Sequence, residues 1–315
     1  MRMLPTMLVV AIVLGAGGCA ATAGHPVVAD GRTPAASYSP ISAVQPTAVP
    51  SPPPSAHPTK SPSTRPTVSA TTTAGPSHAS APTHFGTLPP SAKLPSDAQC
   101  AAWVRARPAK ENKGVNSTAN HTIGQHVAGS LFSGDSAKAA SAIAPRIDGD
   151  FTGTTQEILR WTACKWGIDE NIVYAQAAVE SWWRQDTLGD WDGDPSACPP
   201  GHGLGADGKA GQCPQSYGIL QDRWPYMKQG WPGFGRSTAM DADMAYGIWR
   251  ACFDGYETWL NTVDRGQTYR SGDAWGCVGR WFSGRWHTSA ADGYVTKVKQ
   301  YESQKIWTTR DFQQP

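Results

Sequence analysis

The chain has little net charge, no apolar run long enough to cross a bilayer, and no closely spaced cysteines. Its net charge of +2 over 315 residues is too small to suggest nucleic-acid binding and exerts no long-range pull on anionic surfaces. The apolar run from Leu8 to Leu14 is too short for a membrane span. No two of the cysteines after Cys19 stand two to four residues apart, as zinc ligands usually do. No segment has the pattern of a strand. The sequence therefore predicts a mainly α protein, with nothing that calls for a metal or a cofactor.

Composition divides the chain into a lead and a folded part. All 14 Trp lie at or after Trp103, whereas 17 of the 26 Pro lie at or before Pro95. Residues 20–96 are rich in Pro, Ser, Thr and Ala and cannot bury enough apolar area to offset their ordering entropy, so we expect a disordered, extended linker. A transition segment over 97–153 and a helical domain over 154–315 should follow.

Residues 1–19 have the features of a bacterial export signal. Arg2 precedes the apolar run, and small residues lead to Cys19. This resembles a lipobox, in which Cys19 would be lipidated after cleavage and would tether the protein to the outer face of the plasma membrane. Ala16 stands where Leu is commonest, so plain secretion into the cell wall with a chance cysteine remains an alternative.

The remaining six cysteines are an even number in an exported chain, which indicates three disulfides. Fifteen connectivities are possible. The pairing that we expect is Cys198–Cys213, Cys252–Cys277 and Cys100–Cys164.

Capping signals and apolar spacing predict the helices. One should begin near Cys100 and end at Arg107, and another should run from Thr155 to Trp166 and end at Gly167. Asp169 should cap the next helix. Further helices are expected at about 240–250, 252–264, 274–282 and 289–303, and a long loop at 189–214.

Glu180 is the most informative residue. It is the only carboxylate in the stretch Ala175–Trp183, and it falls on the stripe of the Asp169-capped helix that should face the core. Desolvation there would raise the pKa of Glu180, as a general acid requires at neutral pH. A buried Glu paired with an Arg is the alternative interpretation.

Four motifs then follow in a familiar order. Glu180-Ser181, Gly218-Ile219-Leu220-Gln221, Trp281-Phe282-Ser283-Gly284 and Tyr294 resemble the E-S, G-L-M-Q, Y-N-x-G and later Tyr motifs of lysozyme-like lytic transglycosylases. The resemblance covers roughly residues 155–305. It implies a goose-type, lysozyme-like helical fold and a peptidoglycan glycan strand as substrate.

The resemblance also implies roles for individual residues. Glu180 would be the single catalytic acid and base, protonating the glycosidic oxygen after N-acetylmuramic acid. The sugar's own acetamido group and 6-hydroxyl would replace a second enzyme carboxylate, leaving a 1,6-anhydro end. Substrate-binding positions would be Ser181, Gly218, Ile219, Gln221, Trp281 and Tyr294.

Two departures from the family pattern bear on these roles. About 40 residues separate Glu180 from Gln221, more than is usual, and the excess is the 189–214 loop, which could roof the glycan cleft. Phe282 replaces the Asn of Y-N-x-G, which puts any polar contact of that Asn in doubt.

Other interpretations remain open at this stage. A hydrolase of the same fold would need a second carboxylate, for which the candidates are Asp186, Asp190, Asp192 and Asp194. A non-catalytic glycan-binding module is a rival of another class, although it would have little reason to keep Glu180. We expect a monomer.

The chain carries two further patterns, an acidic run and a set of tryptophans. Asp190, Asp192 and Asp194 resemble the start of a calcium loop, but Pro195 stands where an EF-hand requires Gly, so a polar turn is favoured. Several tryptophans could stack on sugar rings rather than fill the core. They are Trp182, Trp183, Trp191, Trp224, Trp231 and Trp286, of which the loop residues Trp191, Trp224 and Trp231 are the better candidates.

Overall fold

The computed structural model describes residues 82–132, 137–266 and 268–314. The predicted export signal, Cys19 and residues 20–81 of the predicted linker lie outside the described residues. Within the described residues, no helix combines the length and the apolar character that crossing a bilayer requires.

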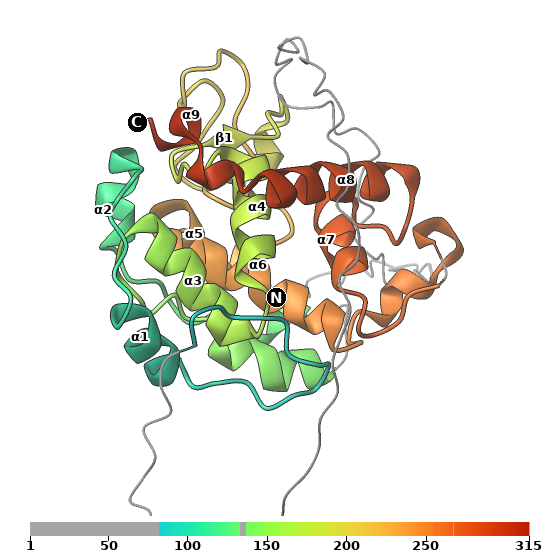
Figure 1. Ribbon diagram of the computed structural model, residues 1–315. Coiled ribbons are helices and arrows are strands. Elements are labelled where there is room, and N and C mark those ends of the chain that lie inside the picture. The colour runs from blue at the N-terminus through green and yellow to red at the C-terminus, as the bar shows by residue number, and fades with distance from the viewer. Residues whose placement is uncertain (1–81, 133–136, 267, 315) are drawn as a thin grey trace, which may run out of the picture. The chain divides into compact units, whose positions relative to one another are not determined.

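The described chain is mainly helical, as the sequence predicts (Figure 1). Its α-helices are α1 Asp97–Arg105, α2 Ser117–Asn120, α3 Thr155–Trp166, α4 Glu170–Ser181, α5 Gly233–Arg236, α6 Thr238–Phe253, α7 Ala274–Ser283, α8 Ser289–Gln304 and α9 Arg310–Gln313. Three two-residue strands, β1 Leu188–Gly189, β2 Ser216–Tyr217 and β3 Asp222–Arg223, form an antiparallel sheet in that order.

The α3–α4 hairpin follows its capping residues. Thr154 and Glu157 form a capping box at the start of α3, and Gly167 ends that helix in the left-handed conformation at φ 60°. The side chain of Asp169 accepts from the Asn171 N–H and caps α4. The predicted bounds of α3 and the predicted cap of α4 are therefore confirmed.

Helix α6 runs through the core. All of its residues from Thr238 to Phe253 are buried. It packs against α3, α5 and α7, and α8 lies across α4 and α7 (Figure 1). Because α6 also carries Asp241, Asp243 and Arg250, three ionisable groups lie in the interior, where each needs compensation.

Two sequence predictions about secondary structure are wrong. A helix over 252–264 does not form: α6 ends at Phe253, Gly255 takes φ +87°, and only short 3₁₀ turns follow at Thr258–Asn261 and Val263–Arg265. The sheet was missed because strands of two residues are too short to show an alternating pattern.

The folded part begins earlier in the chain than the composition indicates. Phe85 is buried at 6% exposure, and its carbonyl accepts from the Glu170 N–H. Leu88 N–H donates to the Gly167 carbonyl, and Arg250 donates to the Pro89 carbonyl at 2.7 Å. Residues 82–96 therefore contact the α3–α4 turn. The prolines in this range belong to an extended segment that is part of the folded body.

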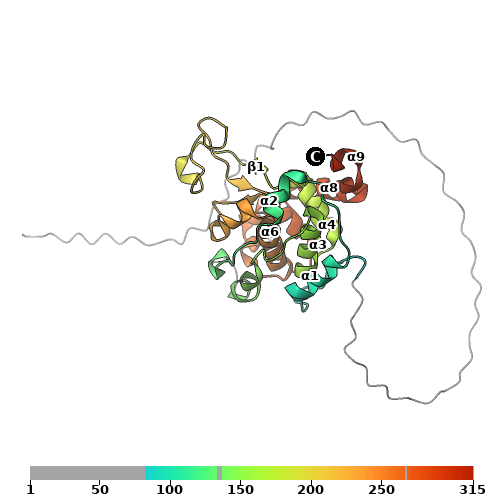
Figure 2. The same ribbon diagram turned by 90° about the vertical axis from the view of Figure 1, so that its left-hand side faces the viewer.

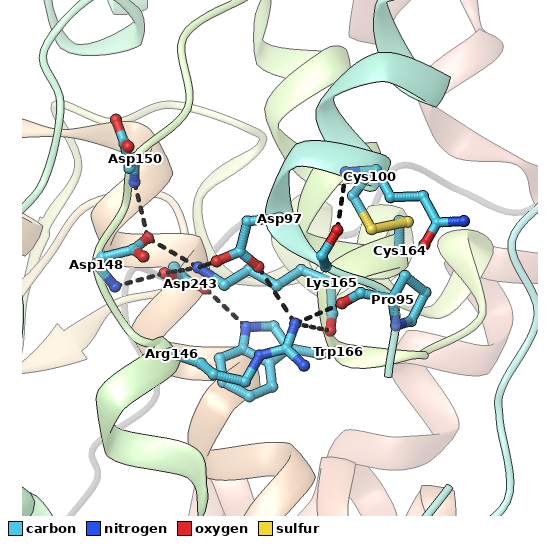
Figure 3. A network of polar contacts seen from close by, with 12 residues as sticks. Pro95, Asp97, Cys100, Arg146, Asp148, Asp150, Cys164, Lys165, Trp166 and Asp243 are labelled. Carbon is cyan, nitrogen blue, oxygen red and sulfur yellow. Dashed lines mark hydrogen bonds and ion pairs between the residues drawn. A yellow bond between two sulfur atoms is a disulfide. The ribbon is translucent and has the colours of Figure 1, made fainter. Parts of the chain in front are cut away.

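The segment 97–153 is also tied to the helical body rather than forming a mere transition. Lys165, which is fully buried, lies 2.8 Å from Asp148, 2.9 Å from Asp243 and 3.5 Å from Asp97 (Figure 3). Arg146 donates to the Lys165 carbonyl in the same network. Burial lowers the pKa of Lys165, but the charges and hydrogen bonds of Asp243 and Asp148 outweigh it and raise that pKa.

All three expected disulfides are present. Cys100–Cys164 links α1 to α3, Cys252–Cys277 links α6 to α7, and Cys198–Cys213 closes the loop after β1. Part of that loop (yellow) extends outward from the helices in both views (Figures 1 and 2). Three disulfides are consistent with an oxidising, extracytoplasmic compartment.

Candidate active site

Glu180 is the penultimate residue of α4 and is half-buried. The stripe that precedes it is buried at Val173, Gln176 and Ala177, so the predicted core face is confirmed up to the last turn. At Glu180 the burial is incomplete, so this residue has partial access to solvent. A group in this position can meet a substrate while most of the helix remains fixed in the core.

The chain reverses directly after Ser181. Trp182 and Trp183 both take left-handed conformations, at φ 58° and 63°. Such conformations are costly for residues with a Cβ and persist only where the surroundings hold them. Trp183 is fully buried, and its indole donates to the Tyr174 carbonyl at 2.9 Å.

The C-terminal segment covers this reversal. Phe312 is fully buried, with its ring centroid 4.6 Å from that of Trp182 and 5.1 Å from that of Trp183. Lys113 donates to the Phe312 carbonyl at 2.5 Å, which holds α9 in place. Burial lowers the pKa of Lys113.

Tyr294 of α8 contacts the Glu180 carboxyl directly. Its hydroxyl donates to Glu180 Oε1 at 2.5 Å. Burial and then the charge of Glu180 raise the pKa of Tyr294, so the phenol keeps its proton. Tyr246 of α6 has a raised pKa for the same two reasons, with Asp241 adding to them. The last of the four motifs therefore contacts the first directly.

The segment 218–221 is fastened to α4 and α7 through its backbone. Ser181 Oγ donates to the Ile219 carbonyl at 2.8 Å, and Trp281 Nε1 donates to the Leu220 carbonyl at 3.1 Å. Asp241 Oδ1 accepts from the Leu220 N–H at 2.7 Å. The four motifs, distant in sequence, therefore meet at the end of α4.

Gly218 is required at its position. Its φ is +80°, and a Cβ there would lie 2.0 Å from Asp241 Oδ2. Both the backbone conformation and the close approach of Asp241 exclude a larger residue.

Gln221 is the half-buried residue of this segment. It takes φ 59°, and its side-chain amide donates to the Thr187 and Gly218 carbonyls at 3.1 and 2.9 Å. A Cβ on Gly189 would lie 2.2 Å from Gln221 Oε1, so β1 and this amide are in close contact. The strained backbone and fixed amide suit a residue that presents a polar group at a site.

Most of the other predicted substrate-binding side chains are buried. Ile219 is fully buried, and Ser181, Trp281 and Tyr294 are 7–8% exposed. The resemblance assigns sugar contact at Gly218 and Ile219 to the backbone, so burial of the Ile219 side chain does not test it. Trp281 fixes the backbone of the 218–221 segment through its hydrogen bond to the Leu220 carbonyl.

The acids proposed as second carboxylates all have local partners. Asp186 pairs with Arg184, and Asp190 accepts from Ser216 Oγ at 2.6 Å. Asp192 accepts from Gln215 at 2.9 Å, and Asp194 caps the 3₁₀ turn Pro195–Ala197. These contacts are those of a polar turn. Among the described residues no cluster of three or more His, Cys, Asp or Glu is arranged to hold a metal ion.

Burial and the charge of Glu180 raise the pKa of two acids that the sequence does not single out. Asp222 of β3 and Asp241 of α6 are fully buried. Burial raises the pKa of Asp222, and the charges of Asp241 and Glu180 add to that rise. For Asp241, burial and the Glu180 charge outweigh the opposing Leu220 N–H and Gln185 side chain. Neither oxygen of Asp222 has a hydrogen-bond partner among the described residues. The one sequence signal for Asp222 is its position directly after Gln221.

The tryptophans that were candidates for sugar stacking include buried and half-buried residues. Trp183 and Trp286 are core residues, at 0% and 2% exposure. The three loop tryptophans are half-buried. Trp191 lies under Lys209 and Trp224 under Lys228, and Trp231 packs edge-on against His202 and Tyr217.

Neither a scan against protein-family models nor searches of curated proteins and of solved structures found a match for this chain. The function is therefore inferred from the residues of the site.

Proposed function

We propose that this protein is a peptidoglycan-cleaving lytic transglycosylase with a lysozyme-like domain and Glu180 as its single acid and base. The observation that carries the proposal is the half-buried Glu180 carboxyl, which accepts a hydrogen bond from Tyr294 and lies at the junction of the four motif segments. A general acid must be accessible to the leaving oxygen and held in one orientation.

The surroundings of Glu180 favour the non-hydrolytic route. A glycosidase that works by hydrolysis needs a second carboxylate at the scissile bond to activate water or attack carbon. Asp222 and Asp241 are fully buried and do not reach a substrate. The other four acids are held by hydrogen-bond or ion-pair partners: Asp186, Asp190, Asp192 and Asp194. In the proposed reaction Glu180 protonates the glycosidic oxygen, the bond to the muramic acid C1 breaks, and the 6-hydroxyl of the same sugar closes on C1. Glu180 then takes up the proton of that hydroxyl, so it returns to its starting state.

The proposed setting is the outer side of the plasma membrane, with the protein monomeric and Cys19 as a lipid anchor. The three disulfides support an extracytoplasmic setting.

Product analysis tests the proposal. Purified sacculi digested with the protein should release 1,6-anhydro-muramyl products, lighter by one water than those of hydrolysis. Reducing muramyl ends as the main product would instead indicate a hydrolase. In that case an Asn substitution at one of Asp186, Asp190, Asp192 or Asp194 should be nearly as damaging as loss of Glu180. Binding to sacculi without any release would indicate a glycan-binding module.

A further inference from the structure

The segment before α3 reaches the catalytic end of α4 through one buried side chain. Asn116, which ends the 3₁₀ turn Gly114–Asn116, is fully buried. Its amide nitrogen donates to the Trp183 carbonyl at 2.7 Å and to Thr155 Oγ1 at 3.0 Å, and its Oδ1 accepts from the Gln185 N–H at 2.7 Å. The two backbone groups that Asn116 binds belong to Trp183, the second residue of the reversal after Ser181, and to Gln185, two residues further on.

Gln185 extends these contacts to the second motif. It is 5% exposed, its Oε1 accepts from the Ile219 N–H at 3.1 Å, and its amide nitrogen donates to the Phe234 carbonyl at 2.8 Å. A buried amide whose donor and acceptor are both satisfied is held in one rotamer, since turning it would leave polar groups unpaired. Asn116 and Gln185 together therefore span from α3 to the 218–221 segment.

We propose that Asn116 is a positioning residue for Glu180, and that it acts through Gln185 to hold the reversal after Ser181 against the 218–221 segment. The proposal rests on the proposed function. The segment 97–153 would then be part of the catalytic unit. A misplacement of about 1 Å by a residue remote from the chemistry can cost about 100-fold in rate.

Asn116→Ala and Asn120→Ala form a matched pair for the test. Asn120 is also fully buried and donates to Thr155 Oγ1 at 3.0 Å and to Glu111 at 2.6 Å, but it makes no hydrogen bond to Trp183 or Gln185. Both variants should lose thermal stability. With soluble glycan strands as substrate, we expect kcat of folded Asn116→Ala to fall by roughly 10- to 100-fold at near-constant KM, and kcat of Asn120→Ala to stay within about twofold of the wild type.

A double variant decides whether the two amides act as a unit. Gln185→Met removes the side-chain hydrogen bonds of Gln185, and it replaces Asn116→Ala in the kinetic test if that variant does not fold. If Asn116 acts through Gln185, the double variant should lose little more kcat than the worse single variant. Equal kcat for folded Asn116→Ala and Asn120→Ala, or fully additive losses, would overturn the proposal.

Amide hydrogen exchange gives a readout that needs no activity. Asn116→Ala should lower the protection of the Gln185 and Ile219 N–H groups, whereas Asn120→Ala should not. A wild-type protein that cleaves no glycan but shows this difference would refute the proposed function and leave the positioning contact standing. An active wild type without the difference would refute the positioning role alone.

Discussion

Asp241 and Asp243 stand two residues apart on α6 and are equally buried, yet their environments are opposite. Asp243 accepts from Lys165 at 2.9 Å, from the Trp166 indole at 2.8 Å, and from the Asp148 and Gly149 N–H groups. Asp241 accepts from the Leu220 N–H, and its charged neighbour is Glu180. No ion pair among the described residues includes Asp241 or Asp222.

The difference is that a cation contacts Asp243 and none contacts Asp241 among the described residues. Burial raises the pKa of both groups, but the Lys165 charge opposes that rise only at Asp243. The Lys165 network is a compensated charge cluster that fastens 97–153 to the core (Figure 3). Asp241 and Asp222 have no cation among their partners in the described part of the chain, so no positive charge opposes the rise in their pKa that burial and the Glu180 charge cause. Groups with perturbed pKa values cluster at functional sites, which fits the proposed role of Glu180.

Removing the cation from the compensated cluster should have the largest effect. Lys165→Met leaves the buried Asp243 and the half-buried Asp148 without their cation. We therefore expect the free energy of unfolding to fall by about 3–5 kcal/mol. Urea denaturation at pH 7 measures this. The double variant Lys165→Met/Asp243→Asn should recover part of the loss, because no unpaired charge remains at α6. A loss below about 1 kcal/mol would remove the contrast between the two regions.

Removing the acid from the other cluster should change activity instead of stability. Glu180→Gln keeps the side-chain shape but cannot deliver a proton, so lysis of sacculi should fall at least ~100-fold. Glu302→Gln, on the partly exposed surface of α8, is the matched control and should lyse at the wild-type rate. Near-wild-type lysis by folded Glu180→Gln would mean that another group is the acid.

The uncompensated acid Asp222 should make stability depend on pH. Its pKa is raised in the folded state, so between the unfolded value of about 3.9 and the folded value the native protein binds an extra proton. Stability from this group is therefore lost as the pH rises. The free energy of unfolding of Asp222→Asn should rise relative to that of the wild type by up to about 1.4 kcal/mol for each pH unit above 4.

Unfolding measured at intervals from pH 4 to 8 shows whether this gain exists. A constant offset between Asp222→Asn and the wild type over that range would mean that Asp222 is ionised in the native protein. Asp311→Asn, at an exposed carboxyl on α9, is the control and should show no such trend.

An exposed pair gives the smallest effect. His84 lies 2.9 Å from Asp169 and 3.2 Å from Glu170 at the start of α4. Partial burial lowers the pKa of His84, but its hydrogen bond and charge contact with Asp169, and then Glu170, outweigh this and raise it. The stabilisation is thus complete below about pH 6.5 and is lost as the pH rises through the folded value. His84→Gln should be less stable than the wild type at pH 5.5, by under ~1 kcal/mol because solvent screens the pair, and equal to it at pH 8.5. Thermal melts at the two pH values check this, and a deficit that persists at pH 8.5 would contradict it.

Local signals were enough to predict most of the helical fold. Thr154 with Glu157, Gly167 and Asp169 define the ends of α3 and α4 by capping, which depends only on neighbouring residues. The expected helix over 252–264 failed because apolar spacing continued past Gly255, whose left-handed backbone ends it. The segment 82–96 was assigned to the linker because composition does not reveal that Phe85 finds a buried site.

The sequence by itself determined the mainly helical class, the even set of six cysteines after Cys19 and the prominence of Glu180, because composition, capping and one carboxylate in an apolar helix can be read without knowing the fold. Tertiary structure alone decided which groups surround that carboxylate. Asp222, Asp241, Asn116 and Gln185 come from four separate segments, and no local pattern marks them apart from the position of Asp222 directly after Gln221. Their burial, and the presence or absence of a cation beside each acid, set their charge and role. Those quantities exist only when segments distant in sequence exclude water together.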